Sequence, residues 1–134
     1  MKLNKSLISL ILCAFAFIGF QEAQAQTMRG KASYYAGKFH GRRTSSGEIF
    51  HKDSMTCAHR SLPFGTMLRV RNTSNGREVV VRVTDRGPFA VGRIVDLSLG
   101  AARQLGMVAA GVTGVELEVI SKPGQKQSGT AGTH

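Results

Sequence analysis

Cysteine, aromatic and acidic residues are all scarce in this chain of 134 residues, which has two Cys, 7% aromatic residues and eight Asp or Glu against 18 Lys or Arg. Removal of residues 1–25 as a signal peptide would leave only Cys57, so no disulfide could form within the mature chain. The few aromatic residues leave little for stacking on bases, and no nucleic-acid-binding motif is visible. We therefore expect no nucleic-acid partner, and the length predicts one domain with tails.

No apolar run reaches the ~20 residues of a membrane span. The longest, Leu7 to Phe20, follows Lys2 and Lys5 and precedes the small-residue sequence Ala23 to Ala25. This pattern predicts a secretory signal peptide over residues 1–25. The alternative is an uncleaved N-terminal anchor, which the short apolar run disfavours.

Export and charge together suggest where the chain acts. Cys13 lies inside the apolar run rather than after a small residue at its end, so there is no lipobox and we expect no lipid anchor. The net charge of +10 suits an anionic partner such as the cell wall. We expect a monomer in the periplasm or cell envelope, with no stable membrane span after signal cleavage.

The rest of the chain divides by composition. Residues 26–29 form a short lead, residues 30–120 are dense in apolar residues and predict the folded domain, and residues 121–134 predict a disordered tail. Apolar alternation and turn residues predict six strands: Ala32–Tyr35, Ser54–Ala58, Met67–Arg71, Arg77–Asp85, Arg93–Leu97 and Val115–Val119. The first two have the weakest signals.

One short helix is predicted over Leu99–Leu105, capped by Asp96 or Ser98 and ended by Gly106. Short strands, many turns and one short helix favour a small, mainly β barrel.

Asp85 is the most informative polar residue. Val79, Val81, Val83 and Asp85 share one face of a strand, so Asp85 continues the core face just before the turn at Gly87. A carboxyl group at the rim of a core is partly desolvated, which raises its pKa and suits a general acid. The alternative is a structural Asp that caps the following turn.

Two other residues are weaker candidates. Glu48 lies in a polar loop that begins at Thr44, and alone it predicts a solvated carboxylate; His59, alone, predicts a structural histidine. Because the positive charge of the domain stabilises a carboxylate, a second acidic group, Glu48 or Asp96, would be needed nearby to keep Asp85 protonated. His59 could orient a carboxyl group or a sugar hydroxyl.

Other chemistries are disfavoured. His40, His51 and His59 lack the spacing of metal ligands, so we expect no metal ion and no cofactor. Cys57 is better explained as a small buried residue than as a nucleophile.

The chain resembles the rare lipoprotein A (RlpA) family from about Gly30 to Ile120, in five separated motifs: Gly30–Tyr35, Phe39–Glu48, Ala58–Thr66, Val83–Phe89 and Arg93–Ser98. The resemblance implies a six-stranded double-psi β-barrel with one or two short helices. It also implies an endolytic transglycosylase that cleaves peptidoglycan glycan strands, preferring strands without stem peptides. Cys57 stands where the family usually has Ala.

By position in these motifs, Asp85 is similar to the catalytic acid of the family, and Glu48 and His59 to its other active-site residues. We expect six residues to contact the glycan: Tyr35, Phe39, Thr44, Ser46, Arg86 and Asp96. Tyr34 and Phe64 are further aromatic candidates. The missing lipobox, and the absence of the family's SPOR domain after Ile120, argue against its outer-membrane anchor and septal targeting here.

The activity that the resemblance implies is cleavage of the β-1,4 bond between N-acetylmuramic acid and N-acetylglucosamine, which leaves 1,6-anhydro ends. The attacking hydroxyl belongs to the substrate, so one acid–base carboxyl group suffices, unlike in ordinary glycosidases. The alternative is an expansin-like module that binds or loosens the wall without cutting it. A secreted inhibitor or effector is a weaker third hypothesis.

Overall fold

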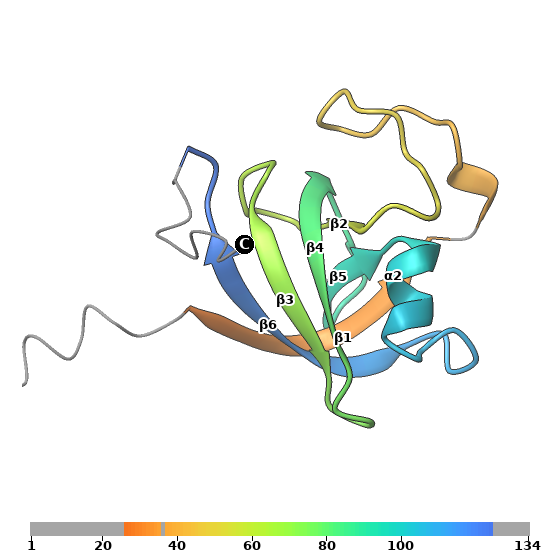
Figure 1. Ribbon diagram of the computed structural model, residues 1–134, viewed down its shortest axis with the longest axis vertical. Coiled ribbons are helices and arrows are strands. Elements are labelled where there is room, and N and C mark those ends of the chain that lie inside the picture. The colour runs from red at the N-terminus through yellow and green to blue at the C-terminus, as the bar shows by residue number, and fades with distance from the viewer. Residues whose placement is uncertain (1–25, 36, 125–134) are drawn as a thin grey trace, which may run out of the picture.

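The computed structural model describes residues 26–35 and 37–124. The predicted signal peptide and residues 125–134 of the predicted tail lie outside these residues. The six strands of the described chain close into a barrel in the order β1-β5-β2-β4-β3-β6 (Figure 1). Their bounds are Thr27–Tyr34 (β1), Thr56–Ala58 (β2), Met67–Asn72 (β3), Glu78–Asp85 (β4), Arg93–Leu97 (β5) and Thr113–Ser121 (β6).

The pairing of the strands confirms the predicted double-psi topology. β1 runs parallel to β5 and β2 runs parallel to β4, whereas every other neighbouring pair is antiparallel. Alternation fills the barrel interior as predicted, because Val79, Val81 and Val83 are all buried on the inner face of β4. Leu68 and Val70 of β3 meet them from the neighbouring strand.

The first and last strands, β1 and β6, are longer than the sequence predicts. β1 begins at Thr27, so residues 27–29 belong to the barrel rather than to a lead, and β6 extends through Ser121. Both extensions come from antiparallel pairing, since Thr27 opposes Glu118 and Ser121 opposes Met67. Local alternation is weak at these ends, and barrel closure supplies their partners.

A short helix, α2 (Leu99–Gln104), follows β5. Its cap is Ser98, whose hydroxyl accepts a hydrogen bond from the Ala101 amide at 3.2 Å, and Asp96 takes no part in the cap. Gly106 follows the helix with a φ of 69°, as predicted for a residue that ends it. Within the described part of the chain, no helix is long and apolar enough to cross a membrane.

The long connection between β1 and β2 prepares the site. Its described residues include a 3₁₀ turn, η1 (Gly37–Phe39), and a bridge between Arg43 and Ile49. In Figure 1 this connection stands at the end of the barrel where β4 finishes, while the β3–β4 hairpin turn lies at the opposite end. The end of β4 carries Asp85, so the connection can reach its carboxylate.

Candidate active site

Asp85 ends β4 with its carboxylate fully engaged by hydrogen bonds. Oδ1 accepts bonds from the Ser45 amide at 3.0 Å, the Ser45 hydroxyl at 2.7 Å and the Arg86 amide at 2.9 Å. Oδ2 accepts a bond from the Tyr35 hydroxyl at 3.0 Å. The residue is half-buried, so this carboxylate is both held in place and accessible to a ligand.

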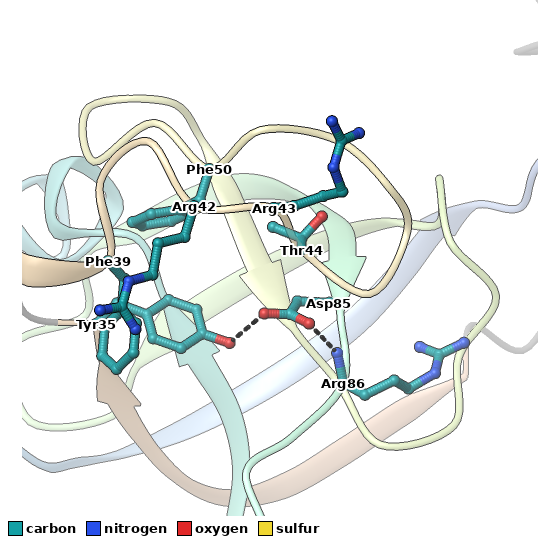
Figure 2. Close-up of a pocket in the computed structure, with 8 residues that line it drawn as sticks. All are labelled: Tyr35, Phe39, Arg42, Arg43, Thr44, Phe50, Asp85 and Arg86. Carbon is teal, nitrogen blue, oxygen red and sulfur yellow. Dashed lines mark hydrogen bonds between the residues drawn. The ribbon is translucent and has the colours of Figure 1, made fainter.

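Aromatic rings form one side of the pocket in which Asp85 lies. Tyr35 packs edge-on against Phe39 and Phe50, with ring centroids 5.5 and 5.2 Å apart. The pocket measures about 350 Å³ and is lined by the eight residues drawn in Figure 2: Tyr35, Phe39, Arg42, Arg43, Thr44, Phe50, Asp85 and Arg86. A few polar groups beside an aromatic wall are typical of small-ligand sites. A sugar ring has the same mixture of apolar faces and hydroxyl edges.

The pKa of Asp85 corrects one expectation. Burial does raise it, as predicted, but hydrogen bonds from the Ser45 side chain, the Ser45 and Arg86 amides and Tyr35 outweigh burial and lower it below the ordinary value. Neither Glu48 nor Asp96 is among the groups that shift the pKa of Asp85, so the expected effect of a second acidic group is not found. Burial and the neighbouring Asp85 carboxylate raise the pKa of Tyr35, so its hydroxyl keeps its proton and remains a donor.

Glu48 lies beside this pocket rather than in it. Its Oε2 accepts a 2.7 Å hydrogen bond from Arg82 Nη1 within an ion pair, and a 3.2 Å bond from the Ser46 hydroxyl. The hydrogen bond from Arg82 lowers the pKa of Glu48. Glu48 lines a smaller cavity of about 60 Å³ that shares Thr44 with the Asp85 pocket. At neutral pH it is a paired carboxylate, which suits positioning better than proton transfer.

The loop around Glu48 links it to Asp85 indirectly. Ser46 donates its amide to the Thr84 carbonyl at 3.2 Å, and Ser45 makes both bonds to Asp85 Oδ1. Arg43 and Thr44 close the loop through bonds to the carbonyls of Gly47 and Glu48. Glu48 therefore holds the loop that holds Asp85.

His59 is buried and serves the backbone. Its Nδ1 accepts hydrogen bonds from the amides of Ser61 and Leu62 at 3.1 and 3.0 Å. Burial, Arg86 and Arg60 lower its pKa, which keeps the ring neutral. Its amide donates to the Asp85 carbonyl at 3.1 Å, but no hydrogen bond joins its ring to the Asp85 carboxylate among the described residues.

Asp96 shares the barrel rim with Asp85. The register places Asp96 beside Ala58 on one side, while Asp85 lies beside Ala58 on the other. The Ser33 hydroxyl donates a hydrogen bond to Asp96 Oδ1. Tyr35 is close enough to both carboxylates for each to raise its pKa.

The six expected substrate residues divide in two. Tyr35, Phe39, Thr44 and Arg86 line the Asp85 pocket, whereas Ser46 and Asp96 are outside its lining. Of the further aromatic candidates, Phe64 packs under the Arg86 guanidinium at 4.0 Å. The Tyr34 hydroxyl donates to the Val108 carbonyl at 2.9 Å and so has a structural bond of its own.

Four residues at or beside the site were not predicted from the sequence: Ser45, Arg42, Phe50 and Arg82. Ser45 and Arg42 lie in the Phe39–Glu48 motif, and their place in this motif could have indicated a role in the site. Arg82 carried no such signal, because it lies on the outer face of β4, one of many exposed cations.

The Cys57 thiol is poorly suited to nucleophilic chemistry. Cys57 is buried, and burial, with Asp96 nearby, strongly raises the pKa of its thiol, which suppresses the nucleophilic thiolate. Across residues 26–35 and 37–124, no three His, Cys, Asp or Glu side chains gather closely enough to bind a metal ion.

The fold and the pocket define a double-psi β-barrel domain with a candidate acid–base carboxylate at its rim. Residues 27–117 match the family described as lytic transglycolase, so the chain belongs to that family. This result confirms the resemblance described from the sequence motifs.

Curated relatives agree with this assignment. A "probable endolytic peptidoglycan transglycosylase RlpA" of Nostoc is 56% identical over 72% of this chain and 26% of its own length. The endolytic peptidoglycan transglycosylase RlpA proteins of Vibrio cholerae and Campylobacter jejuni are 55% and 51% identical over 71% and 73% of this chain, and 36% of their own lengths. The chain thus spans roughly a quarter to a third of these relatives.

Solved structures share the barrel at lower identity. The Streptomyces papain inhibitor is 26% identical over 69% of this chain and 93% of its own, with a TM-score of 0.56. A mutant of the Clavibacter michiganensis expansin in complex with cellohexaose is 26% identical over 75% of this chain and 54% of its own, with a TM-score of 0.58.

Proposed function

We propose that this protein is an endolytic peptidoglycan transglycosylase that cleaves between N-acetylmuramic acid and N-acetylglucosamine. The observation that carries the proposal is Asp85: one accessible carboxylate, oriented by four hydrogen bonds, in a pocket with an aromatic wall. The names of the curated relatives support the same reaction.

The reaction needs two proton transfers, and Asp85 takes part in both. Protonated Asp85 donates its proton to the glycosidic oxygen as the bond from that oxygen to the anomeric carbon of the muramic residue breaks. The 6-hydroxyl of the same residue then attacks the anomeric carbon and gives its proton to the Asp85 carboxylate. The products are a 1,6-anhydro end and a free 4-hydroxyl, and Asp85 regains its proton.

One acid–base carboxylate is sufficient because the nucleophile belongs to the substrate. Inverting glycosidases hold a water, and retaining ones form a covalent adduct, so both need a second carboxylate. Here Glu48 is paired with Arg82 and lines another cavity. The His59 ring accepts hydrogen bonds from nearby backbone amides. In this proposal Glu48 and His59 act as positioning residues for Asp85.

The lowered pKa of Asp85 makes protonation the critical step. Free Asp85 is a carboxylate at neutral pH, because its hydrogen bonds outweigh its burial. A glycan that covers the pocket removes water from the carboxylate and so favours its protonated form. Activity is therefore expected to rise as the pH falls below neutral.

The decisive test compares the chain from Gln26 onward with its Asp85→Asn variant on amidase-stripped peptidoglycan. Products are identified by mass spectrometry. Anhydro-ended fragments with the unmodified chain, and none with Asp85→Asn, support the proposal. Fragments that persist with Asp85→Asn refute the role of Asp85.

A binding module without catalysis is the second candidate. It is favoured by the resting ionisation of Asp85 and by the fold shared with an expansin whose structure contains cellohexaose. The same experiment separates the two functions, because glycan that sediments with the protein without any fragments supports binding alone.

We also propose that the protein is exported to the periplasm or cell envelope and acts there as a monomer. The apolar run before Ala25 and the net charge of +10 support this location. The mass of the protein recovered from the envelope tests it, because cleavage after Ala25 predicts a chain that begins at Gln26.

A further inference from the structure

Three arginines line the Asp85 pocket, and two of them are committed to their own chain. Arg43 Nη1 donates to the Gly47 carbonyl at 2.8 Å, and in Figure 2 its guanidinium points away from Asp85. Arg86 Nη1 donates to the carbonyls of His59 and Leu62 at 3.1 and 2.8 Å. Their charges therefore serve loop structure.

Arg42 is different. Its guanidinium carbon lies over the Phe39 ring, 5.7 Å from the centroid, which is a cation–π contact. Figure 2 shows the guanidinium beside the Tyr35 and Phe39 rings, on the aromatic side of the pocket. Among the described residues it pairs with no carboxylate, in contrast to the five arginines that do: Arg29, Arg69, Arg71, Arg82 and Arg103.

Arg42 and Asp85 thus stand at two ends of one row. The Asp85 carboxylate accepts a bond from Tyr35, Tyr35 packs against Phe39, and Phe39 carries the guanidinium of Arg42. A ligand lying on this wall meets a proton-transfer group at one end and an unpaired planar cation at the other. A guanidinium binds a carboxylate through two parallel hydrogen bonds.

We propose that Arg42 recognises the free lactyl carboxylate of N-acetylmuramic acid, an inference that rests on the proposed function. This carboxylate is on the 3-oxygen of the sugar ring whose anomeric carbon reacts at Asp85. A stem peptide converts it into an uncharged amide, so only stripped strands present the anion. Arg42 would then favour stripped strands because they carry the anion. This selection by charge would add to any exclusion of a stem peptide by its size.

The test measures binding, with every protein carrying Asp85→Asn so that no substrate is cut. The first ligand is amidase-stripped glycan, and the second is the same glycan converted to its methylamide by carbodiimide coupling, which removes the charge with little added bulk. With Arg42 present, the free acid is expected to bind about tenfold more tightly than the methylamide. With Arg42→Gln, the two ligands are expected to bind equally.

Arg77→Gln is the matched control. Arg77 is exposed, pairs with no carboxylate within the described chain, and lies at the β3–β4 turn at the other end of the barrel. Its loss removes the same charge and is expected to leave the acid-to-amide ratio unchanged. A ratio near one with Arg42 present, or a ratio that survives Arg42→Gln, overturns the inference.

These outcomes are independent of cleavage. If the chain with Asp85 intact yields no anhydro fragments but Arg42→Gln abolishes the ratio, the transglycosylase proposal fails and Arg42 still recognises the carboxylate. If fragments form but the ratio is unaffected by Arg42→Gln, the proposed function stands and the inference about Arg42 fails.

Discussion

The Asp85 pocket and its supporting flank use polar groups in opposite ways. We define the flank as Glu48, Arg82 and His59 with the backbone they hold. In the pocket, Asp85 and Arg42 face space that a ligand can fill. In the flank, Glu48 is bound to Arg82 and the His59 ring accepts two backbone amides. The contrast indicates that candidate residues from the family motifs can have two different roles. Some face the ligand, and others hold those residues in position.

Replacing Asp85 is expected to have the largest effect. Asp85→Asn removes the exchangeable proton but keeps an acceptor for Ser45, so cleavage of stripped glycan should fall about 10³-fold while glycan binding remains. Fragment yield against time measures the rate, and a pull-down measures binding. Glu48→Gln serves as the contrast, and an equal loss from both variants would erase the distinction between pocket and flank.

His59 tests the flank through stability. His59→Ala leaves the amides of Ser61 and Leu62 without a partner and opens a cavity, which should lower the free energy of unfolding by about 3 kcal/mol. His59→Asn, which keeps an acceptor, should lose less. Urea denaturation followed by circular dichroism measures both. Similar losses from the two variants would contradict the acceptor role.

The lowered pKa of His59 adds a pH dependence with a definite sign. A histidine whose folded pKa lies below its unfolded value stabilises the fold above about pH 6.5, and this stability is lost as the pH falls toward the folded pKa. Unfolding measured from pH 7.5 to 5 should show this loss in the unmodified chain and a flatter profile with His59→Asn. An unchanged profile would assign the effect to other groups.

Glu48 is expected to show a smaller effect that can be reversed. Glu48→Gln weakens the pair with Arg82 and loosens the loop that carries Ser45, which should lower the cleavage rate about tenfold. The charge-swapped pair, Glu48→Arg with Arg82→Glu, should recover most of that loss. Failure of the swap, together with a pH profile altered in Glu48→Gln, would indicate that Glu48 takes part in proton transfer.

Replacing Ser45 is expected to give the smallest change in cleavage rate, and it tests whether Asp85 acts first as an acid or as a base. Its hydroxyl helps to lower the pKa of Asp85, so Ser45→Ala should raise that pKa and enlarge the protonated fraction. If Asp85 first donates a proton, the activity falls off above its pKa, so kcat/KM near pH 6 should rise about threefold and this limb of the pH profile should move to higher pH. A fall in kcat/KM near pH 6 would show that Asp85 first acts as a base.

Much of the barrel was predictable from local patterns. The hydrophobic alternation of β3 and β4, the turn between them and the Ser98 cap appear in the sequence because neighbouring residues decide them. The early start of β1 was not predictable. Its partner residues lie on β6, about ninety positions away, and only barrel closure brings them together.

For the site, the sequence by itself determined that Asp85 ends a buried strand face, because side chains alternate across a strand. It placed Glu48 and His59 in motifs but could not assign their roles. Only the tertiary structure decided that Ser45 and Tyr35 bond the Asp85 carboxylate and lower its pKa. It also decided that Arg42, at the other end of the aromatic wall, pairs with no carboxylate of the described residues. Those properties depend on which donors surround a group in space, and such contacts join segments far apart along the chain.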